Sequence, residues 1–274
     1  MSPAPQAVAV TGASGQVGTL LCERLGERGV RVIPLGRGDD WRAGIAGADA
    51  VVHLAGTLQP RRGESYEAAN VAPAQEVARA ARAGGCGRIV FLSYVGASLR
   101  SRNAYLRAKA TAEHKLQGSG LPTTIFRCLH IYGPPERPGP TAGPFLAEDS
   151  KAVTVPGTGR QRIQPLYIGD VVAAVAAAAT GEQATSGTFE LGGPEEISMD
   201  EFVRALNGGA EVKIRHLPAP VARLAARLSP SLTPALMELL LTDNVTTAPV
   251  AEIAERFDFT PHRLAEVWPP ARAR

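Results

Sequence analysis

Short apolar runs alternate with longer helical stretches through the first half of the chain, and this alternation constrains the fold more than any other feature. Five runs have the length of a buried parallel strand: Ala7–Val10, Val30–Leu35, Ala50–Leu54, Ile89–Leu92 and Thr124–Arg127. Three stretches between them have helical character: Leu20–Arg28, Tyr66–Arg82 and Ala104–Leu116. The pattern predicts an α/β fold, a doubly wound parallel sheet with helices on both faces. Residues 36–49 are too few for a full strand and helix, so we expect a trimmed sheet there.

The composition changes from Tyr132 onward, because YGPPERPGPTAGP is rich in Pro and Gly and cannot continue a helix or a central strand. We expect a core of residues 1–132, to which residues 163–192 return, and a smaller C-terminal substrate lobe of residues 133–162 and 193–274. The later elements are predicted at Ile168–Thr180, Thr188–Leu191, Met199–Leu206 and Val212–Arg215. Val221–Leu228 and Ala235–Leu241 are amphipathic, which usually indicates packing within a lobe and only occasionally a membrane or partner face.

Composition and charge exclude several classes of protein. The 274 residues are 45% hydrophobic and 20% charged, as in an ordinary soluble globular protein. The formal net charge is only +3 and the basic residues are spread along the sequence, so no nucleic-acid partner is expected. The longest apolar stretch, residues 171–179, is far shorter than a bilayer requires, so no membrane partner is expected either. We expect a cytoplasmic monomer or homodimer that acts on a small-molecule substrate.

The cysteines and the N-terminus agree with that expectation. Cys22, Cys86 and Cys128 are odd in number and widely spaced, and they lack the spacing of metal ligands. Neither a disulfide framework nor a metal site is predicted. The opening residues MSPAPQ provide no basic region ahead of the first apolar run, which has the length of a strand and not of a signal peptide.

A glycine-rich segment follows the first predicted strand. In AVAVTGASGQVG, Gly12, Gly15 and Gly18 lie between that strand and the first helix. Glycines here permit a tight turn, close approach of the backbone to a pyrophosphate and close helix packing, while the helix N-terminus supplies N–H donors. The spacing alone would also suit a plain strand-to-helix turn, but its place after the first strand favours a Rossmann-type dinucleotide site. The residues expected to line the phosphates are Gly12, Ser14, Gly15, Gln16 and Val17.

The end of the second strand bears on the choice of dinucleotide. NAD-preferring sites usually place a carboxylate there for the ribose 2′-hydroxyl, whereas this strand ends in Gly36 followed by Arg37. A guanidinium can bind a 2′-phosphate through paired charge-assisted hydrogen bonds. The sequence therefore favours NADP(H) over NAD(H). The alternative is that Arg37 is a solvated loop residue and that Asp39 or Asp40 binds the ribose.

Tyr105 and Lys109 lie four residues apart on a predicted helix, so both side chains project from one face. A phenol beside an ammonium suits proton donation to a carbonyl oxygen, because the cation stabilises the phenolate and lowers the pKa of the tyrosine. The same spacing is common on helix surfaces. The catalytic interpretation is strengthened by the other motifs of the chain. These are the phosphate loop, the HLAG strand end that begins at His53, Asn70 at the next helix, and Ser93 at another strand tip.

With GTGRQRIQPLYIGDV, GTFELGGPE and LTDNV further along, these motifs make nearly the whole chain resemble the short-chain dehydrogenase/reductase superfamily. The resemblance is to its extended, atypical NAD(P)-binding branch, related to sugar-nucleotide epimerases and close to the complex I accessory-subunit relatives. It implies that Tyr105 is the acid/base, that Lys109 binds the nicotinamide ribose, and that Asn70 supports the helix or a proton relay. It also implies cofactor contacts from Leu54, Ala55, Gly56, Cys128 and His130.

Two positions depart from the pattern of that branch. Many members place a second Ser or Thr at the strand tip to polarise the substrate carbonyl, whereas this chain has Ser93 followed by Tyr94. Tyr94 either replaces that serine as a donor or packs in the pocket while Ser93 satisfies the backbone. Sugar-nucleotide enzymes commonly have an arginine for the diphosphate where this chain has Ile163, which argues against a sugar-nucleotide substrate. His130, where relatives often place Asn, is the candidate to contact substrate.

These observations predict an NADPH-dependent oxidoreductase that reduces a carbonyl-type group on a small apolar molecule, with Tyr105 and Lys109 at the reacting centre. Two alternatives remain. One is a non-catalytic NAD(P)H-binding sensor or assembly protein, which the replacement of serine by Tyr94 keeps open. The other is a nucleotide-sugar epimerase or dehydratase, which Ile163 and Arg37 disfavour.

Overall fold

A six-stranded parallel sheet forms the centre of the molecule. The computed structural model describes residues 6–147, 152–209, 212–229 and 232–269. The strands are β1 (Ala7–Thr11), β2 (Arg31–Leu35), β3 (Ala50–His53), β4 (Arg88–Tyr94), β5 (Thr123–Cys128) and β10 (Gly187–Leu191). They lie in the order β10-β5-β4-β3-β1-β2, and every neighbouring pair is parallel. The predicted Rossmann-type α/β fold is confirmed.

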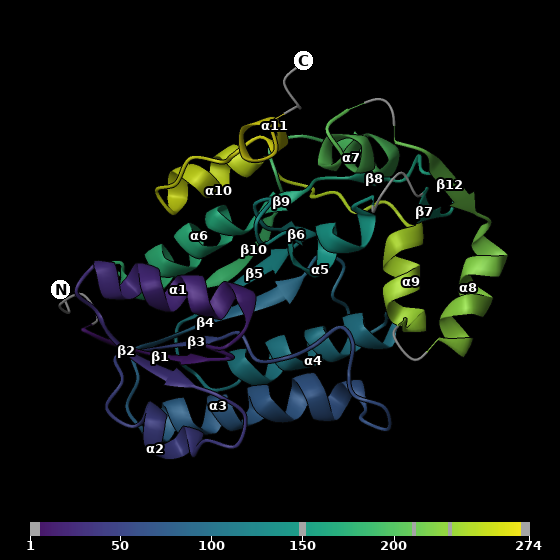
Figure 1. Cartoon of the computed structure of the whole chain (residues 1–274). Coiled ribbons are helices and arrows are strands. Elements are labelled where there is room, and N and C mark those ends of the chain that lie inside the picture. The colour runs from purple at the N-terminus through teal and green to yellow at the C-terminus, as the bar shows by residue number, and fades with distance from the viewer. Residues whose placement is uncertain (1–5, 148–151, 210–211, 230–231, 270–274) are drawn as a thin grey trace.

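Helices cover both faces of the sheet (Figure 1). The helices of the doubly wound part are α1 (Gln16–Glu27), α2 (Trp41–Ile45), α3 (Ala72–Ala83), α4 (Ala104–Gln117) and α6 (Ile168–Thr180). α1 and α6 pack together on one face, and α2, α3 and α4 pack on the other. The short α2 takes the place of a full strand and helix between β2 and β3, in agreement with the small number of residues there.

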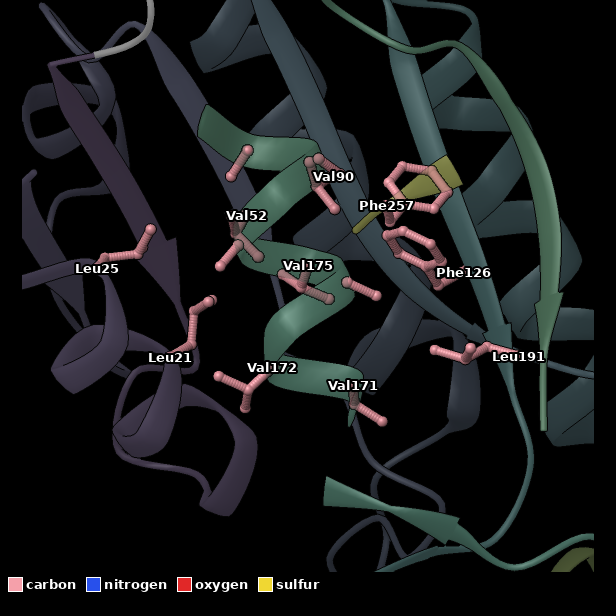
Figure 2. Close-up of a cluster of buried hydrophobic side chains, with 14 of the residues drawn as sticks. Leu21, Leu25, Val52, Val90, Phe126, Val171, Val172, Val175, Leu191 and Phe257 are labelled. Carbon is pink, nitrogen blue, oxygen red and sulfur yellow. The ribbon is translucent and has the colours of Figure 1, made fainter. Parts of the chain in front are cut away.

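α6 is the central helix of the larger core. Its sequence, IGDVVAAVAAAAT, is apolar around most of its circumference, which suits a helix buried between the sheet and another helix. Figure 2 shows Val172 and Val175 of α6 among side chains from the sheet, with Leu21 of α1 to one side. Phe257 follows α10 (Val250–Arg256) and packs edge to face against Phe126 of β5, with ring centroids 4.8 Å apart. The C-terminal part of the chain therefore returns to the main sheet.

The rest of the chain forms a second packed unit around its own core. Its elements are β6 (Ile131–Tyr132), α5 (Gly139–Ala142), a 3₁₀ turn η2 (Gly143–Phe145), β7 (Val153–Pro156), β8 (Arg162–Ile163), β9 (Leu166–Tyr167), β11 (Ile197–Ser198), α7 (Met199–Leu206), β12 (Ile214–Leu217) and α11 (Leu264–Val267). The short strands pair as β11-β8, β12-β7 and β6-β9. Tyr132, Phe202 and Ile163 are buried together at its centre.

A helical pair, α8 (Ala219–Leu228) and α9 (Pro234–Leu241), lies beside this second unit. Ala222 and Ala226 of α8 pack against Met237 of α9. The opposite side of α9 presents Ala235 and Leu239 to tyrosines of the main domain. α9 therefore forms a roof over part of the main domain, with α8 outside it.

Two predicted helices differ from the observed ones. α1 begins at Gln16, four residues before its predicted start, because the glycine segment itself forms the first helical turn. The stretch predicted as one helix from Tyr66 divides into a π-helical turn, η1 (Glu67–Val71), followed by α3. Within the described ranges, no helix has the length and apolar character needed to span a membrane.

Candidate active site

The glycine segment after β1 folds into a turn that only glycine fits. Gly12 has a φ of +72°, and a Cβ there would lie 2.8 Å from the backbone nitrogen of Ala55. A Cβ on Gly18 would overlap the carbonyl oxygen of Gly12. The turn is thus pressed against the end of β3 on one side and against α1 on the other, and larger residues are excluded by backbone atoms that cannot move independently.

The N-terminus of α1 is left open by this turn. Gly15 is the N-cap, and no side chain caps the helix. Ser14 and Gln16 are exposed, and Val17 is half-buried. The backbone N–H groups of the first turn therefore face outward with the positive end of the helix dipole, which is what a pyrophosphate requires. The glycine cradle and the uncapped helix together fit the phosphates of a dinucleotide.

The loop after β3 forms the neighbouring wall. Leu54 is tied to β1 through its backbone N–H, which donates to the Thr11 carbonyl at 3.1 Å. Asn70 is buried, and its amide accepts from the backbone N–H of Thr57 and donates to the carbonyls of Thr57 and Tyr66. A Cβ on Gly56 would lie 2.7 Å from the Asn70 oxygen. Asn70 therefore holds this loop in place through hydrogen bonds to backbone groups.

His53 connects three strands at this edge of the sheet. Its Nδ1 is 2.7 Å from the Thr11 hydroxyl, and its ring stacks on Phe91 with centroids 5.4 Å apart. Burial, together with the charge of Lys109, lowers the pKa of His53 to about 3. His53 is therefore neutral at physiological pH and braces the carboxyl ends of β1, β3 and β4.

At the end of β2 both acidic alternatives are engaged with the backbone. The Asp39 carboxylate accepts from the N–H of Gly36 at 2.7 Å, and Asp40 caps α2 by accepting from Ala43. Arg37 is exposed. A Cβ on Gly36 would lie 3.4 Å from the Asp39 oxygen, so that carboxylate stands beside the position where NAD enzymes place their acid. Among the described residues Arg37 has no ion-pair partner, whereas the Asp39 carboxylate already accepts one backbone hydrogen bond.

Tyr105 lies in the first turn of α4, under the roof formed by α9. Asn103 caps α4 by accepting from the backbone of Tyr105, and its amide donates to the Ala235 carbonyl of α9 at 2.9 Å. The Tyr105 ring is packed edge to face against Tyr66 and Tyr94, with centroids 6.0 and 5.8 Å apart. No hydrogen bond joins its hydroxyl to any residue in the described part of the chain. That hydroxyl remains available to a substrate.

Lys109 is buried one turn further along α4. Its Nζ donates to the Leu92 carbonyl at 2.5 Å and lies 4.1 Å from the centre of the Phe91 ring. Burial lowers the pKa of Lys109 to about 8, although Glu113 and Cys128 act in the opposite direction. The expectation that the lysine lowers the pKa of Tyr105 is wrong for this structure, because burial raises that pKa and the ammonium is engaged with β4.

Tyr94, His130 and Asn244 form a buried hydrogen-bonded chain. Both amide protons of Asn244 are donated to carbonyls, those of Leu239 and Thr242, so its Oδ1 is left to accept. The Tyr94 hydroxyl donates to this oxygen at 3.3 Å, and its own oxygen lies 3.3 Å from Nδ1 of His130.

The hydrogen bonds of Asn244 indicate the direction of the others in this chain. Burial lowers the pKa of His130 to about 4, so the ring is neutral and must carry its proton on Nδ1 in order to donate to Tyr94. Burial also raises the pKa of Tyr94, with smaller contributions from Tyr105 and Cys128. Tyr94 has committed its only proton to Asn244, whereas Tyr105 has not.

Two smaller side chains complete the strand tips. Ser93 is buried, and its hydroxyl has no hydrogen-bond partner in the described residues. Cys128 is also buried, and burial raises the pKa of its thiol to about 12, so it is a neutral packing group and not a nucleophile. Within the ranges that the structure describes, no cluster of potential metal ligands is present.

Comparison with known proteins agrees with this geometry. A family model described as the NAD dependent epimerase/dehydratase family matches residues 8–192, which include the glycine turn, Tyr105 and His130. The chain belongs to this family. The complex I subunit "NADH dehydrogenase [ubiquinone] 1 alpha subcomplex subunit 9, mitochondrial" of Arabidopsis thaliana is 32% identical over 69% of this chain and 48% of its own length. A 2-alkyl-3-oxoalkanoate reductase of Stenotrophomonas maltophilia is 27% identical, with 73% of this chain and 74% of that protein covered.

Solved structures share the fold of the family. The structure titled "MoeE5 in complex with UDP-glucuronic acid and NAD" superposes with a TM-score of 0.75 over 96% of both chains, at 19% identity. This likeness shows the fold alone. The chain spans about half the length of the first curated relatives that it matches, with 48%, 56% and 48% of their lengths covered.

The sequence predicts a difference from sugar-nucleotide enzymes at Ile163, and that difference stays a prediction. Ile163 is 1% exposed and belongs to the core of the second unit, where β8 pairs with β11. The neighbouring Arg162 is exposed and forms an ion pair with Glu196. Neither side chain provides the cation that a nucleotide diphosphate would need at this position.

Two residues of the site were not singled out from the sequence. Asn244 lies in the LTDNV motif, which was used for the resemblance only, and its contact with Tyr94 joins residues 150 positions apart. Asn103 directly precedes the predicted helix, and an Asn at that place is a common N-cap. The capping signal could have identified Asn103, but nothing local indicates its bond to α9.

Proposed function

We propose that this protein is an NADPH-dependent reductase of a carbonyl-type group on a small apolar molecule. The observation that carries the proposal is the Tyr105 hydroxyl, which has no hydrogen-bond partner in the described chain and lies beneath an apolar roof. A buried phenol that keeps its proton is a donor for an oxygen that gains negative charge. Because burial raises the pKa of Tyr105, the donor form is present throughout the physiological pH range.

When bound, NADPH would supply a hydride to the carbonyl carbon and become NADP⁺, and the oxygen that gains negative charge would need one proton. Tyr105 gives its hydroxyl proton to that oxygen, and solvent then restores it. In this proposal Lys109, which donates to the Leu92 carbonyl, binds the nicotinamide ribose, and its lowered pKa suits a role in returning the proton. Tyr94 shapes the wall of the site, because its proton is donated to Asn244, whereas the Ser93 hydroxyl has no hydrogen-bond partner in the described residues and remains a second donor.

The preference for NADPH is part of this proposal and rests on Arg37. Its guanidinium is exposed, while Asp39 and Asp40 already accept backbone hydrogen bonds. The guanidinium of Arg37 can therefore donate paired hydrogen bonds to a 2′-phosphate. The Asp39 carboxylate beside Gly36 repels a 2′-phosphate. The preference therefore depends on the attraction by Arg37 exceeding the repulsion by Asp39.

An apolar substrate suits the roof. Ala235 and Leu239 of α9, with Leu58 and Leu106, form one apolar cluster with Tyr94 and Tyr105. A sugar carrying a diphosphate would bring charges and hydroxyl groups that these side chains cannot bind. The name of the relative from Stenotrophomonas maltophilia, a 2-alkyl-3-oxoalkanoate reductase, indicates a substrate with an alkyl and a keto group. Location in the cytoplasm and the state of monomer or homodimer stay predictions.

The test is oxidation of NADPH, followed by absorbance, across a panel of long-chain 3-oxo acids and esters, ketones, aldehydes and quinones. The proposal expects turnover on the alkyl-bearing carbonyl compounds and loss of it in Tyr105→Phe, with NADPH affinity unchanged. Stoichiometric NADPH binding without turnover on any member would favour a non-catalytic binding protein. Turnover of UDP-sugars in preference to alkyl ketones would favour the epimerase alternative.

A further inference from the structure

Large hydrophobic side chains remain exposed in two places near the roof. Among the residues that the structure describes, they are Leu99, Val221, Leu224 and Leu228, which are 60%, 50%, 56% and 78% exposed. Three of them lie on α8 with helical spacing, so they project from one face of that helix. Leu99 lies in the loop between β4 and α4. An exposed apolar stripe on a helix usually marks a surface that is covered in use.

The inner face of α8 is already packed against α9. Ala222 and Ala226 are buried against Met237 of α9, so α8 needs no further contact to be held in the fold. Figure 1 shows α8 on the edge of the molecule, outside α9. The apolar face is therefore additional to what the fold requires.

Both places border α9, the roof over Tyr105. The loop that carries Leu99 ends at Asn103, whose amide donates to the Ala235 carbonyl at the start of α9. α8 packs along the other side of α9. The loop of residues 95–103 and helix α8, which are far apart in the sequence, thus both contact α9.

These two segments are also strongly basic. Residues 95–112 contain four Lys or Arg and no Asp or Glu, and residues 212–237 contain another four and again no acid. The whole chain, by contrast, has a net charge of only +3. The exposed cations among them are Arg100, Arg102, Lys213, Arg215, Arg223 and Arg227. Within the described residues, only Arg223 among them forms an ion pair, with Glu238 on α9. These cations lie on α8, on or just before β12, and in the loop before α4.

We propose that α8 and the loop of residues 95–103 form a docking surface for an anionic lipid bilayer. Leucine and valine side chains can enter the boundary of the acyl chains, while arginines beside them contact lipid phosphates. A second copy of the same surface would instead bring like charges together. The absence of a spanning stretch led to the expectation of no membrane partner, but docking needs only one apolar face of a helix.

Docking in this way places α9 close to the lipid surface. A substrate with an alkyl chain would then pass from the bilayer to Tyr105 along apolar surface. The docking proposal stands on exposure and charge and is tested by binding, so it does not depend on the reductase activity proposed above.

The experiment is flotation of the full chain with vesicles. The expected result is that the wild type floats with vesicles of phosphatidylglycerol and phosphatidylcholine in equal parts and not with phosphatidylcholine alone, and that added salt weakens binding. The double variant Leu224→Asp, Leu228→Asp is expected to bind at least about tenfold more weakly. Arg227→Glu should weaken binding about fivefold or more, since each cation near an anionic surface contributes about 1 kcal/mol.

Arg79→Glu is the matched control, because Arg79 is also exposed but lies on α3, outside the proposed docking surface. It should float as the wild type does. The melting temperature and the NADPH affinity show whether each variant is folded. If the double variant does not fold, Arg227→Glu tests the same surface in its place. The proposal is wrong if the wild type stays in solution, if the double variant floats unchanged, or if the double variant only splits a dimer in analytical ultracentrifugation.

Discussion

The phosphate loop and the roof over Tyr105 are built by opposite means. The loop is a contiguous segment whose recognition groups are backbone N–H donors, and its shape is enforced by close backbone contacts at Gly12 and Gly18. The roof is assembled from distant segments, and α9 is held by side chains that donate to its carbonyls, those of Asn103, Gln161 and Asn244. A ligand part common to many enzymes can be bound by a short fixed motif, whereas a particular substrate needs surfaces that differ between proteins.

The largest expected effect separates the two regions by chemistry. Tyr105→Phe should lower kcat about 10²- to 10⁴-fold, the usual contribution of a general acid, and leave the Kd for NADPH unchanged. Steady-state kinetics and fluorescence titration of NADPH measure the two quantities. Tyr66→Phe is the control, because Tyr66 also packs on Tyr105 but its hydroxyl donates to the Leu58 carbonyl. Equal kcat values in Tyr105→Phe and the wild type would remove Tyr105 as the proton donor.

Gly18→Ala should break the loop and spare the roof. Its Cβ would overlap the Gly12 carbonyl oxygen, and overpacking of this kind costs about 1–3 kcal/mol, which corresponds to a dinucleotide affinity roughly ten- to hundredfold weaker. Gly26→Ala is the control on the same helix, since nothing lies within 4 Å of the added Cβ there. That variant should bind the dinucleotide normally and be slightly more stable. Normal binding by Gly18→Ala would contradict the proposed cradle.

The phosphate loop could be predicted from the sequence to a greater degree than the roof. The strands and the glycine turn follow from local patterns, because a parallel strand and a strand-to-helix turn are encoded by consecutive residues. The return of Phe257 to the main sheet was not anticipated, and neither was the Tyr94–Asn244 contact. Both depend on contacts between residues more than 100 positions apart, for which a single sequence contains no local signal.

Burial explains the one electrostatic expectation that was wrong. From spacing alone, Lys109 should lower the pKa of Tyr105. The fold instead buries both groups and directs the ammonium to the Leu92 carbonyl. Spacing on a helix predicts which side chains share a face, but the depth of that face beneath other elements is set by the tertiary structure.

The choice of dinucleotide provides a smaller effect at the edge of the loop. Arg37→Ala should weaken NADPH binding about tenfold, the size of one charge-assisted hydrogen-bonded contact, and leave NADH binding unchanged. Asp39→Asn should act in the opposite direction by removing a negative charge from beside Gly36. Isothermal titration with both dinucleotides measures the four affinities. Unchanged NADPH affinity in Arg37→Ala would end the proposed preference.

The depressed pKa of Lys109 predicts a dependence of stability on pH. The folded pKa is about 8 and the unfolded value is near 10.4, so between these values the unfolded chain binds more protons and Lys109 raises the free energy of unfolding as pH rises. The free energy of unfolding of the wild type minus that of Lys109→Met should therefore increase by about 1 kcal/mol per pH unit from pH 8 to 10. Urea denaturation of both proteins at several pH values measures it, and a constant difference would show that the lysine is not desolvated.

The smallest effect is expected at Tyr94. Its proton is donated to Asn244, so Tyr94→Phe should lower kcat less than about tenfold, well below the loss expected of a general acid. A loss as large as that of Tyr105→Phe would mean that Tyr94 donates to substrate and that the proton accounting in the Tyr94–His130–Asn244 chain is wrong. Comparison of the two variants on the same substrate decides between these outcomes.

The most direct test of the account is the fate of the hydride. The chain is incubated with NADPH carrying deuterium at C4 of the dihydronicotinamide and with a long-chain 3-oxo ester, and the product is analysed by mass spectrometry. The account predicts a 3-hydroxy ester with one deuterium on the carbinol carbon, formed by the wild type and not by Tyr105→Phe. Tight binding of NADPH with no deuterium in any product of the carbonyl panel would contradict it.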